Sequence, residues 1–253
     1  AQILHSQILD DFSDGNFDQN PSWVGDAANF KISTAGELQL NATMAGNSSL
    51  WVTGNIPDST VWDFDLRLSF DPSNQNQLRV YLQSDQADPT LANGYFIEMG
   101  ETGSADAIKF YRQDAGIKTQ LAVGQAGLAA SFPNLHIRTK RTKSGDWTLE
   151  AGPVGSALQA QFSLMETTWP GGTNRFFGIQ CVYTISNATK FFLDNINIRP
   201  DVPDTQAPVL VAATADNQTQ ITVVFDEDLD LASAENPANY SINNGIGQPL
   251  SAS

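Results

Sequence analysis

The spacing of acidic side chains decides whether this chain could hydrolyse glycosidic bonds. That reaction needs two carboxylates on one face, about 5–9.5 Å apart, which act as acid and as nucleophile or base. Asp63 and Asp65 alternate along "WDFDLRL", but the face that they share is otherwise polar and solvated. The denser run "FDEDLD" at 225–230 is typical of a strand end and turn. Because G-x-S-x-G, H-E-x-x-H and P-loop motifs are also missing, we assign no catalytic residue and predict that the chain is not an enzyme.

A second set of polar side chains suits binding better than catalysis. Period-two alternation places Arg79 and Tyr81 on the polar face of one strand, Glu98 on that of the next, and Tyr111 on a third. A tyrosine ring can stack on a sugar while neighbouring polar groups bond its hydroxyls. Trp169, in the loop-like "TTWPGGTN", is a candidate for the rim of such a site. The alternative for each of these residues is an ordinary solvated surface.

One carboxylate falls on an apolar face. In "KFFLDNINIRP", residues 190–200, strict alternation puts Asp194 beside Phe192, Ile196 and Ile198. Burying an ionised carboxylate without a partner costs several kcal/mol. The pattern therefore predicts a partner for Asp194, which is either a cation or the backbone amides at the strand edge.

The elements that must position these residues are strands. Five segments alternate apolar and polar residues with period two, and Gly-, Pro-, Asn- and Asp-rich turns separate them: "WDFDLRLSF", "LRVYLQ", "AIKFYRQ", "NLHIRTKR" and "DWTLEAG". Helix signals are weak throughout. The pattern predicts an all-β domain of two packed antiparallel sheets, a sandwich.

A proline-rich segment marks a domain boundary. Pro200, Pro203 and Pro208 cannot donate ladder hydrogen bonds, so a central strand ends near them. A new strand pattern begins at "VLVAATADNQTQITVVFDEDLD". We therefore place one domain at 1–202 and the start of a second at 203–253.

Composition excludes several partners. The formal net charge is −15, which repels nucleic acid and anionic membranes. No apolar run approaches the ~20 residues that cross a bilayer, so we expect no direct membrane insertion. The single cysteine, Cys181, lies among apolar neighbours and is predicted to be a buried thiol. The opening "AQILHSQILDDFSDG" resembles a mature end left after removal of a signal peptide, which predicts an exported protein.

The order of several segments resembles that of concanavalin A-like, laminin-G or lectin-like jelly rolls: "DDFSDGNFDQNPSWVGD", "LRVYLQSDQ", "GYFIEMGETG", "FYRQDAG", "RTKSGDWTLEAG" and "KFFLDNINI". The resemblance covers roughly residues 7–199. It is strongest to amino-terminal modules of large bacterial surface proteins with lamin-tail domains and type IX sorting tails. The segment "DTQAPVLVAATADNQTQITVVFDEDLDLASAENPANYSINNG" resembles a bacterial Ig-like repeat that is incomplete here, so further domains are expected after residue 253.

The resemblance implies a metal and a function. In such jelly rolls the first and last strands lie side by side, and many carry a structural calcium there, held by an aspartate of the last strand and oxygens of the amino-terminal segment. Asp194 matches that aspartate, and Asp11 and Asp14 are the amino-terminal candidates. The expected function is that of a secreted, non-catalytic binding or adhesion module at the cell surface that recognises a glycan or surface polymer. A structural spacer without a small ligand is the alternative, and a glycoside-active enzyme is a weaker one.

Overall fold

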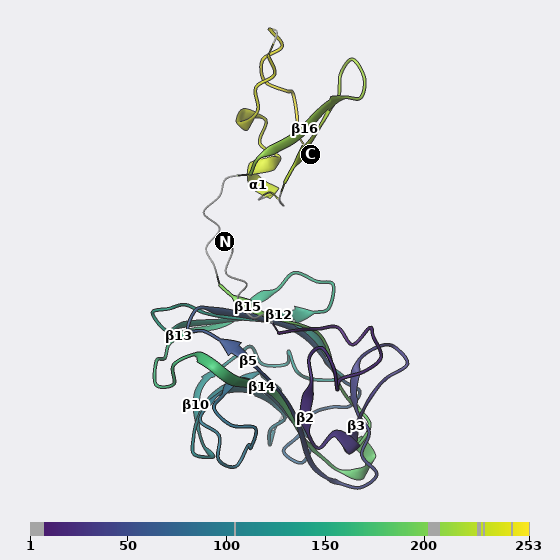
Figure 1. Cartoon of the computed structure of the whole chain (residues 1–253), viewed down its shortest axis with the longest axis vertical. Helices are drawn as coiled ribbons and strands as arrows, with labels where there is room; N and C mark the ends of the chain where they lie inside the picture. The colour runs from purple at the N-terminus through teal and green to yellow at the C-terminus, as the bar shows by residue number, and fades with distance from the viewer. Residues whose placement is uncertain are drawn as a thin grey trace. The chain divides into compact units, whose positions relative to one another are not determined.

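The larger of two units is built from two antiparallel sheets packed face to face, which confirms the predicted sandwich. The computed structural model describes residues 8–103, 105–201, 208–226, 229, 231–243 and 245–252. The chain divides into units Ala1–Val202 and Pro203–Ser253. Figure 1 shows β15, β12 and β13 in one layer of the larger unit and β5, β14 and β10 in the other.

The strands of each sheet are antiparallel to their neighbours. In spatial order, the eight-stranded sheet of the described residues consists of β13 (Gln159–Met165), β12 (Asp146–Pro153), β11 (Asn134–Arg141), β6 (Thr60–Leu68), β15 (Phe191–Pro200), β4 (Leu38–Leu40) and β3 (Phe30–Ile32), with β1 (Ile8–Asp10) also paired to β15. The seven-stranded sheet consists of β10 (Ile117–Val123), β9 (Lys109–Asp114), β8 (Gly94–Met99), β7 (Gln77–Ser84), β14 (Gly172–Tyr183), β5 (Gly46–Ile56) and β2 (Trp23–Gly25).

Helices are short wherever the structure describes the chain. They are the 3-10 turns η1 (Ala27–Asn29), η2 (Ile185–Asn187) and η3 (Pro237–Asn239) and the α-helix α1 (Leu231–Ala234). None of these described helices has the length and apolarity needed to span a bilayer.

The core between the sheets is rich in aromatic side chains. The predicted inward residues of β6, Trp62 and Phe64, are fully buried. The Trp62 ring stacks on Trp147 of β12 with ring centroids 5.4 Å apart. The Trp62 indole N–H donates to the carbonyl of Leu82, 2.7 Å away, so burial leaves this donor paired. Cys181 is also fully buried, and burial raises the pKa of its thiol well above the usual value, which confirms an inert structural thiol.

A β-bulge in β15 overturns the predicted face of Asp194. The register with β6 passes from Asp194 opposite Asp65 to Asn197 opposite Asp63, so one extra residue is inserted between them. Asn195 adopts φ 50°, in the left-handed region that asparagine tolerates. Strict alternation was therefore the wrong assumption. Past the bulge the inward residue is Ile196, whereas Asp194 lies outside the core and is only half-buried.

Strand β15 also joins the two ends of the larger unit. Its residue Ile198 pairs with Ile8 of β1, and its residue Phe192 pairs with Gln39 of β4. The expected contact between the first and last strands is therefore present.

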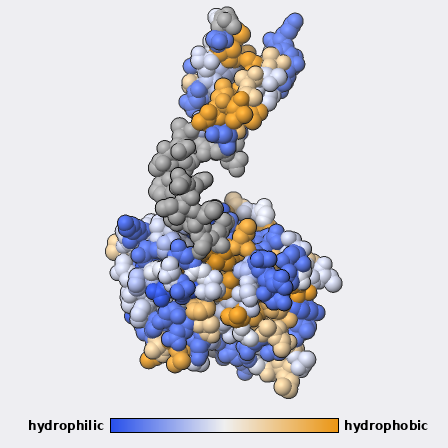
Figure 2. Space-filling view, viewed as in Figure 1, coloured by the Kyte–Doolittle hydropathy of each residue, from blue (hydrophilic) through white to orange (hydrophobic). Residues whose placement is uncertain are grey.

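The smaller unit contains a hairpin of β16 (Leu210–Ala215) and β17 (Ile221–Phe225). Figure 2 shows apolar side chains gathered on the visible surface of this unit. The exposed large apolar residues of this unit include Val211, Ile246 and Leu250. The identification of this unit as part of an Ig-like domain stays a prediction.

Candidate functional site

An aromatic row crosses the outward face of the seven-stranded sheet. It consists of Trp51, Tyr81, Phe96 and Tyr111, from β5, β7, β8 and β9, with successive ring centroids 4.8, 5.0 and 5.1 Å apart. Gly178 of β14 lies opposite both Trp51 and Tyr81 and leaves room for the Trp51 ring. Alternation thus placed Tyr81 and Tyr111 on the correct face.

The aromatic row is covered, which corrects the predicted stacking role of its tyrosines. Tyr81 is 0% exposed and Tyr111 7% exposed, so neither ring is free to stack on a sugar. Two chain segments lie over this face: the carbonyl of Pro170 accepts from the Gln83 amide at 2.6 Å, and that of Pro89 accepts from the Gln113 amide at 2.6 Å. Burial raises the pKa of Tyr81 to about 12.

A row of paired polar groups runs beside the aromatic row. We call Asn47, Gln180, Arg79, Glu98 and Lys118 the polar row. Arg79 Nε donates to Glu98 at 2.7 Å, and Lys118 Nζ lies 2.9 Å from both oxygens of the same carboxylate. Arg79 Nη1 donates to Gln180 Oε1 at 3.0 Å, and Gln180 Nε2 donates to Asn47 Oδ1 at 3.1 Å. Glu98 and Gln180 are buried, whereas Asn47 and Lys118 are exposed at the two ends. The structure therefore joins the predicted Arg79 and Glu98 in one network whose two ends are exposed.

Trp169 lies apart from this network. Its indole N–H donates to Asp114 at 3.0 Å, its backbone N–H donates to the Tyr95 hydroxyl at 2.9 Å, and its carbonyl accepts from Arg141 at 3.0 Å. The half-buried ring packs against the core between the sheets and not against the aromatic row. Its predicted place on the rim of a sugar site has no support in these contacts.

The three predicted calcium ligands each accept hydrogen bonds from residues close to them in the chain. Asp11 accepts from the backbone and hydroxyl of Ser13, and Asp14 accepts from Asn16. Asp194 accepts the backbone N–H of Asn195 at 2.8 Å, which was the alternative to a cation. In the parts of the chain that the structure describes, no three His, Cys, Asp or Glu side chains are arranged to hold a metal ion. The part of these three carboxylates in a calcium site, which would also need backbone oxygens and water, therefore stays a prediction.

Asp194 should destabilise the fold near neutral pH. Its pKa is raised to about 6, mainly by burial and with smaller contributions from the nearby carboxylates, against the lowering effect of the Asn195 hydrogen bond. A carboxyl with a raised pKa stabilises the folded state when protonated, so this contribution is present below about pH 4 and is lost as pH rises through 6. Asp194→Asn should therefore raise the melting temperature by roughly 2–4 °C at pH 7.5, because solvent screens much of the effect. It should change little at pH 4, as thermal unfolding at the two pH values would show.

The matched control is Asp146→Asn. Hydrogen bonds from Ser144 and Thr142 hold the pKa of Asp146 below its usual range, so this substitution should lower the melting temperature at pH 7.5. If Asp194→Asn instead lowered the melting temperature in calcium-containing buffer and not after chelation, a calcium role for Asp194 would be supported.

The alternating carboxylates Asp63 and Asp65 both have side-chain partners on neighbouring strands. Asp63 accepts from Arg138 at 2.7 Å and from Arg199 at 2.6 Å. Asp65 lies 2.6 Å from His136 Nδ1. These contacts give both carboxylates structural partners on the outward face of the eight-stranded sheet.

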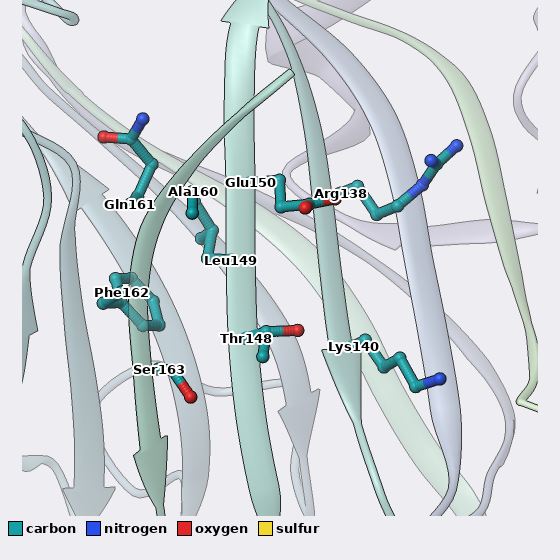
Figure 3. Close-up of a pocket in the computed structure, with 9 residues that line it drawn as sticks. All are labelled: Arg138, Lys140, Thr148, Leu149, Glu150, Ala160, Gln161, Phe162 and Ser163. Atoms are coloured by element: carbon teal, nitrogen blue, oxygen red, sulfur yellow. The ribbon is translucent and has the colours of Figure 1, made fainter.

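A hollow that the sequence did not reveal lies on the outward face of the eight-stranded sheet (Figure 3). It has a volume of about 410 Å³ and is lined from three neighbouring strands, β11, β12 and β13. Its polar side chains include Arg138, Thr148, Glu150 and Ser163. Alternation predicts that these residues face outward, but it does not predict that their side chains leave a concave surface.

Comparisons with known proteins identify the fold. No protein-family model matches the sequence, and a search of curated proteins finds no match. Solved structures do match. The exoplasmic/lumenal domain of VIP36, in a form bound to Ca²⁺ and Man3GlcNAc, is 10% identical with a TM-score of 0.59, over 79% of this chain and 90% of that chain. The carbohydrate recognition domain of Emp46p, in a potassium-bound form, is 12% identical with a TM-score of 0.58, over 78% and 97%. A legume lectin-like domain from Entamoeba histolytica is 12% identical with a TM-score of 0.52, over 72% and 90%. At such identities the likeness shows the fold, a lectin-like sandwich.

Proposed function

We propose that this chain is a non-catalytic carbohydrate-binding module and that the polar row contacts the glycan. The observation that carries the proposal is the continuous network from Asn47 to Lys118, which is exposed at both ends and at the partly exposed Arg79 between them. Within it, Arg79 and Lys118 share the one carboxylate of Glu98. Such a network offers both donors and acceptors to sugar hydroxyls, and it leaves no buried charge unpaired when no ligand is bound.

The aromatic row would support this surface from beneath. The Arg79 guanidinium lies 5.4 Å from the centroid of Phe96, and the Lys118 ammonium lies 4.8 Å from that of Tyr111. These contacts restrict the rotamers of both cations, so less conformational entropy is lost when a ligand binds. Phe96 and Tyr111 thus become positioning residues for the site.

The matched solved structures add a second line of support. VIP36 has been captured with mannose-containing glycans, and Emp46p is described as a carbohydrate recognition domain. By analogy, we propose a glycan or surface polymer as the ligand and an extracellular or lumenal location for this unit. A longer multidomain surface protein, with an Ig-like unit next to the lectin-like one, remains part of the proposal.

The test is glycan-array binding followed by calorimetry on the best ligand. Arg79→Ala removes the central donor of the polar row, so the Kd should rise at least about tenfold, the loss of one charged hydrogen-bond group. The control is Lys143→Ala, which removes an exposed cation from a turn and should leave the Kd unchanged. Circular dichroism would verify that both variants fold. Glycan binding that Arg79→Ala leaves unaltered would contradict the proposed surface.

One observation favours the alternative of a structural spacer. Because the aromatic row is buried, none of its four rings is open for a sugar to stack on. A spacer would bind no glycan on the array, whereas its unfolding would still depend on the aromatic row. An array without a single bound glycan would therefore favour the spacer.

A further inference from the structure

The hollow in the eight-stranded sheet exists because two long cations lean away from it. Arg138 and Lys140 of β11 stand directly opposite Glu150 and Thr148 of β12. Arg138 Nε nevertheless donates to Asp63 at 2.7 Å, on the other side of β11. Lys140 likewise pairs with Asp201 at 2.8 Å. Figure 3 shows both side chains extending away from β12, which leaves the surface over that strand uncovered.

On the opposite side of the hollow, β13 contributes two small side chains beside Gln161 and Phe162. Its residues Ala160 and Ser163 line the hollow, and Ala160 pairs with Glu150. A bulge at Gln161 shifts the register between β12 and β13. The amide of Gln161 is fixed, since its oxygen accepts from the backbone of Gln125 at 2.9 Å and its nitrogen donates to the carbonyl of Gln159 at 3.1 Å. The hollow is therefore held open by fixed neighbours on both sides.

Several polar groups in the hollow lack protein partners. Within the described part of the chain, no side chain or backbone group bonds to the carboxylate of Glu150 or to the hydroxyls of Thr148 and Ser163. The methyl group of Ala160 and the aliphatic stem of Arg138 add apolar surface beside them. A carboxylate, two hydroxyls and an apolar strip match the alternating hydroxyl and C–H surfaces of a sugar ring.

We propose that this hollow is a second carbohydrate site, which takes a single pyranose residue with two adjacent free hydroxyls. Both hydroxyls donate to the Glu150 carboxylate, and the hydroxyls of Thr148 and Ser163 bond to the ring substituents. One C–H face of the ring rests on Ala160. The volume of about 410 Å³ accommodates one such residue. This site shares no residue with the polar row and lies on the other sheet. It therefore goes beyond the proposed function and can be tested independently of it.

The experiment is a titration of the whole chain with methyl glycosides of mannose, glucose and galactose. Amide chemical shifts recorded at each step report where the sugar binds. Shifts should concentrate at 148–150 and 160–163. Glu150→Gln keeps the size of the side chain but removes the charged acceptor, and it should raise the Kd at least about tenfold. Ser163→Tyr should abolish binding, because the ring fills the hollow. Arg79→Ala should leave these shifts intact.

The outcomes separate the two sites. Shifts confined to the polar row and lost in Arg79→Ala would overturn the second site and keep the proposed function. Shifts at 148–150 that survive both Glu150→Gln and Ser163→Tyr would also overturn it, as would a titration without any shift. Thermal unfolding of each variant would show that a loss of binding is not a loss of folding.

Discussion

Replacing Trp147 by alanine should cost about 3–5 kcal/mol of folding free energy, the usual range for a fully buried tryptophan. Its side chain is 0% exposed, stacks on Trp62 and lies with its ring centroid 4.8 Å from that of Tyr95. Its indole N–H also donates to the carbonyl of Glu166 at 3.0 Å, and alanine would leave that acceptor without this donor. Denaturant unfolding at pH 7 measures the loss directly.

Two companion variants show whether packing is the cause. Trp147→Phe retains most of the ring contacts and loses the hydrogen bond, so about 1–2 kcal/mol should be lost. Phe132→Ala removes an aromatic ring that is 65% exposed and should change stability by less than about 0.5 kcal/mol. A cost below about 1 kcal/mol for Trp147→Ala would mean that the contact between the sheets is not centred on this ring.

Replacing Gly178 by alanine should cost about 3 kcal/mol, at the upper end of the range for overpacking. A Cβ atom there would overlap the ring of Trp51 and lie 2.8 Å from the carbonyl oxygen of Leu50. The Trp51 ring cannot move freely, because it packs against Tyr81. The melting temperature should therefore fall by roughly 6–12 °C, and glycan binding should weaken as the polar row loses its support.

The matched control is Gly46→Ala on the neighbouring strand. There a Cβ would lie 3.5 Å from the Tyr183 hydroxyl, an ordinary contact, so stability should change little. A double variant, Gly178→Ala with Trp51→Leu, should recover part of the loss, because the smaller side chain makes room for the methyl group. Equal losses of stability in Gly178→Ala and Gly46→Ala would show that the cost comes from replacing any strand glycine by alanine and not from the Trp51 contact.

Alternation predicted the strands and most of the buried residues, because each predicted strand has one side in the core. Trp62 and Phe64 are buried as predicted. The same rule would also have placed Trp147 in the core, because it stands two residues before the buried Leu149 in β12. Asp194 was misplaced because a single left-handed residue, Asn195, reverses the alternation. The adjacent Asp and Asn, which tolerate that conformation, are a weak signal of such a bulge.

The candidate sites were less predictable because they depend on side chains that meet from distant segments. The face of Tyr81 followed from its strand, but its burial depends on loops near Pro89 and Pro170. The hollow depends on the direction in which Arg138 and Lys140 lean, and Asp63 and Asp201 set that direction. A sequence pattern describes one strand at a time, so it carries no information about such contacts.

The central place of β15 has a consequence for the order of folding. This last strand of the larger unit lies between β6 on one side and β1 and β4 on the other. Pairs such as Ile8 with Ile198 and Leu68 with Phe191 join residues more than a hundred positions apart. During synthesis, β6 therefore keeps an unpaired edge until residue 200 has left the ribosome. Closing such distant pairs is slow, on the order of milliseconds to seconds for sandwich topologies. In that interval the unpaired edge is the part of the nascent chain most exposed to wrong partners.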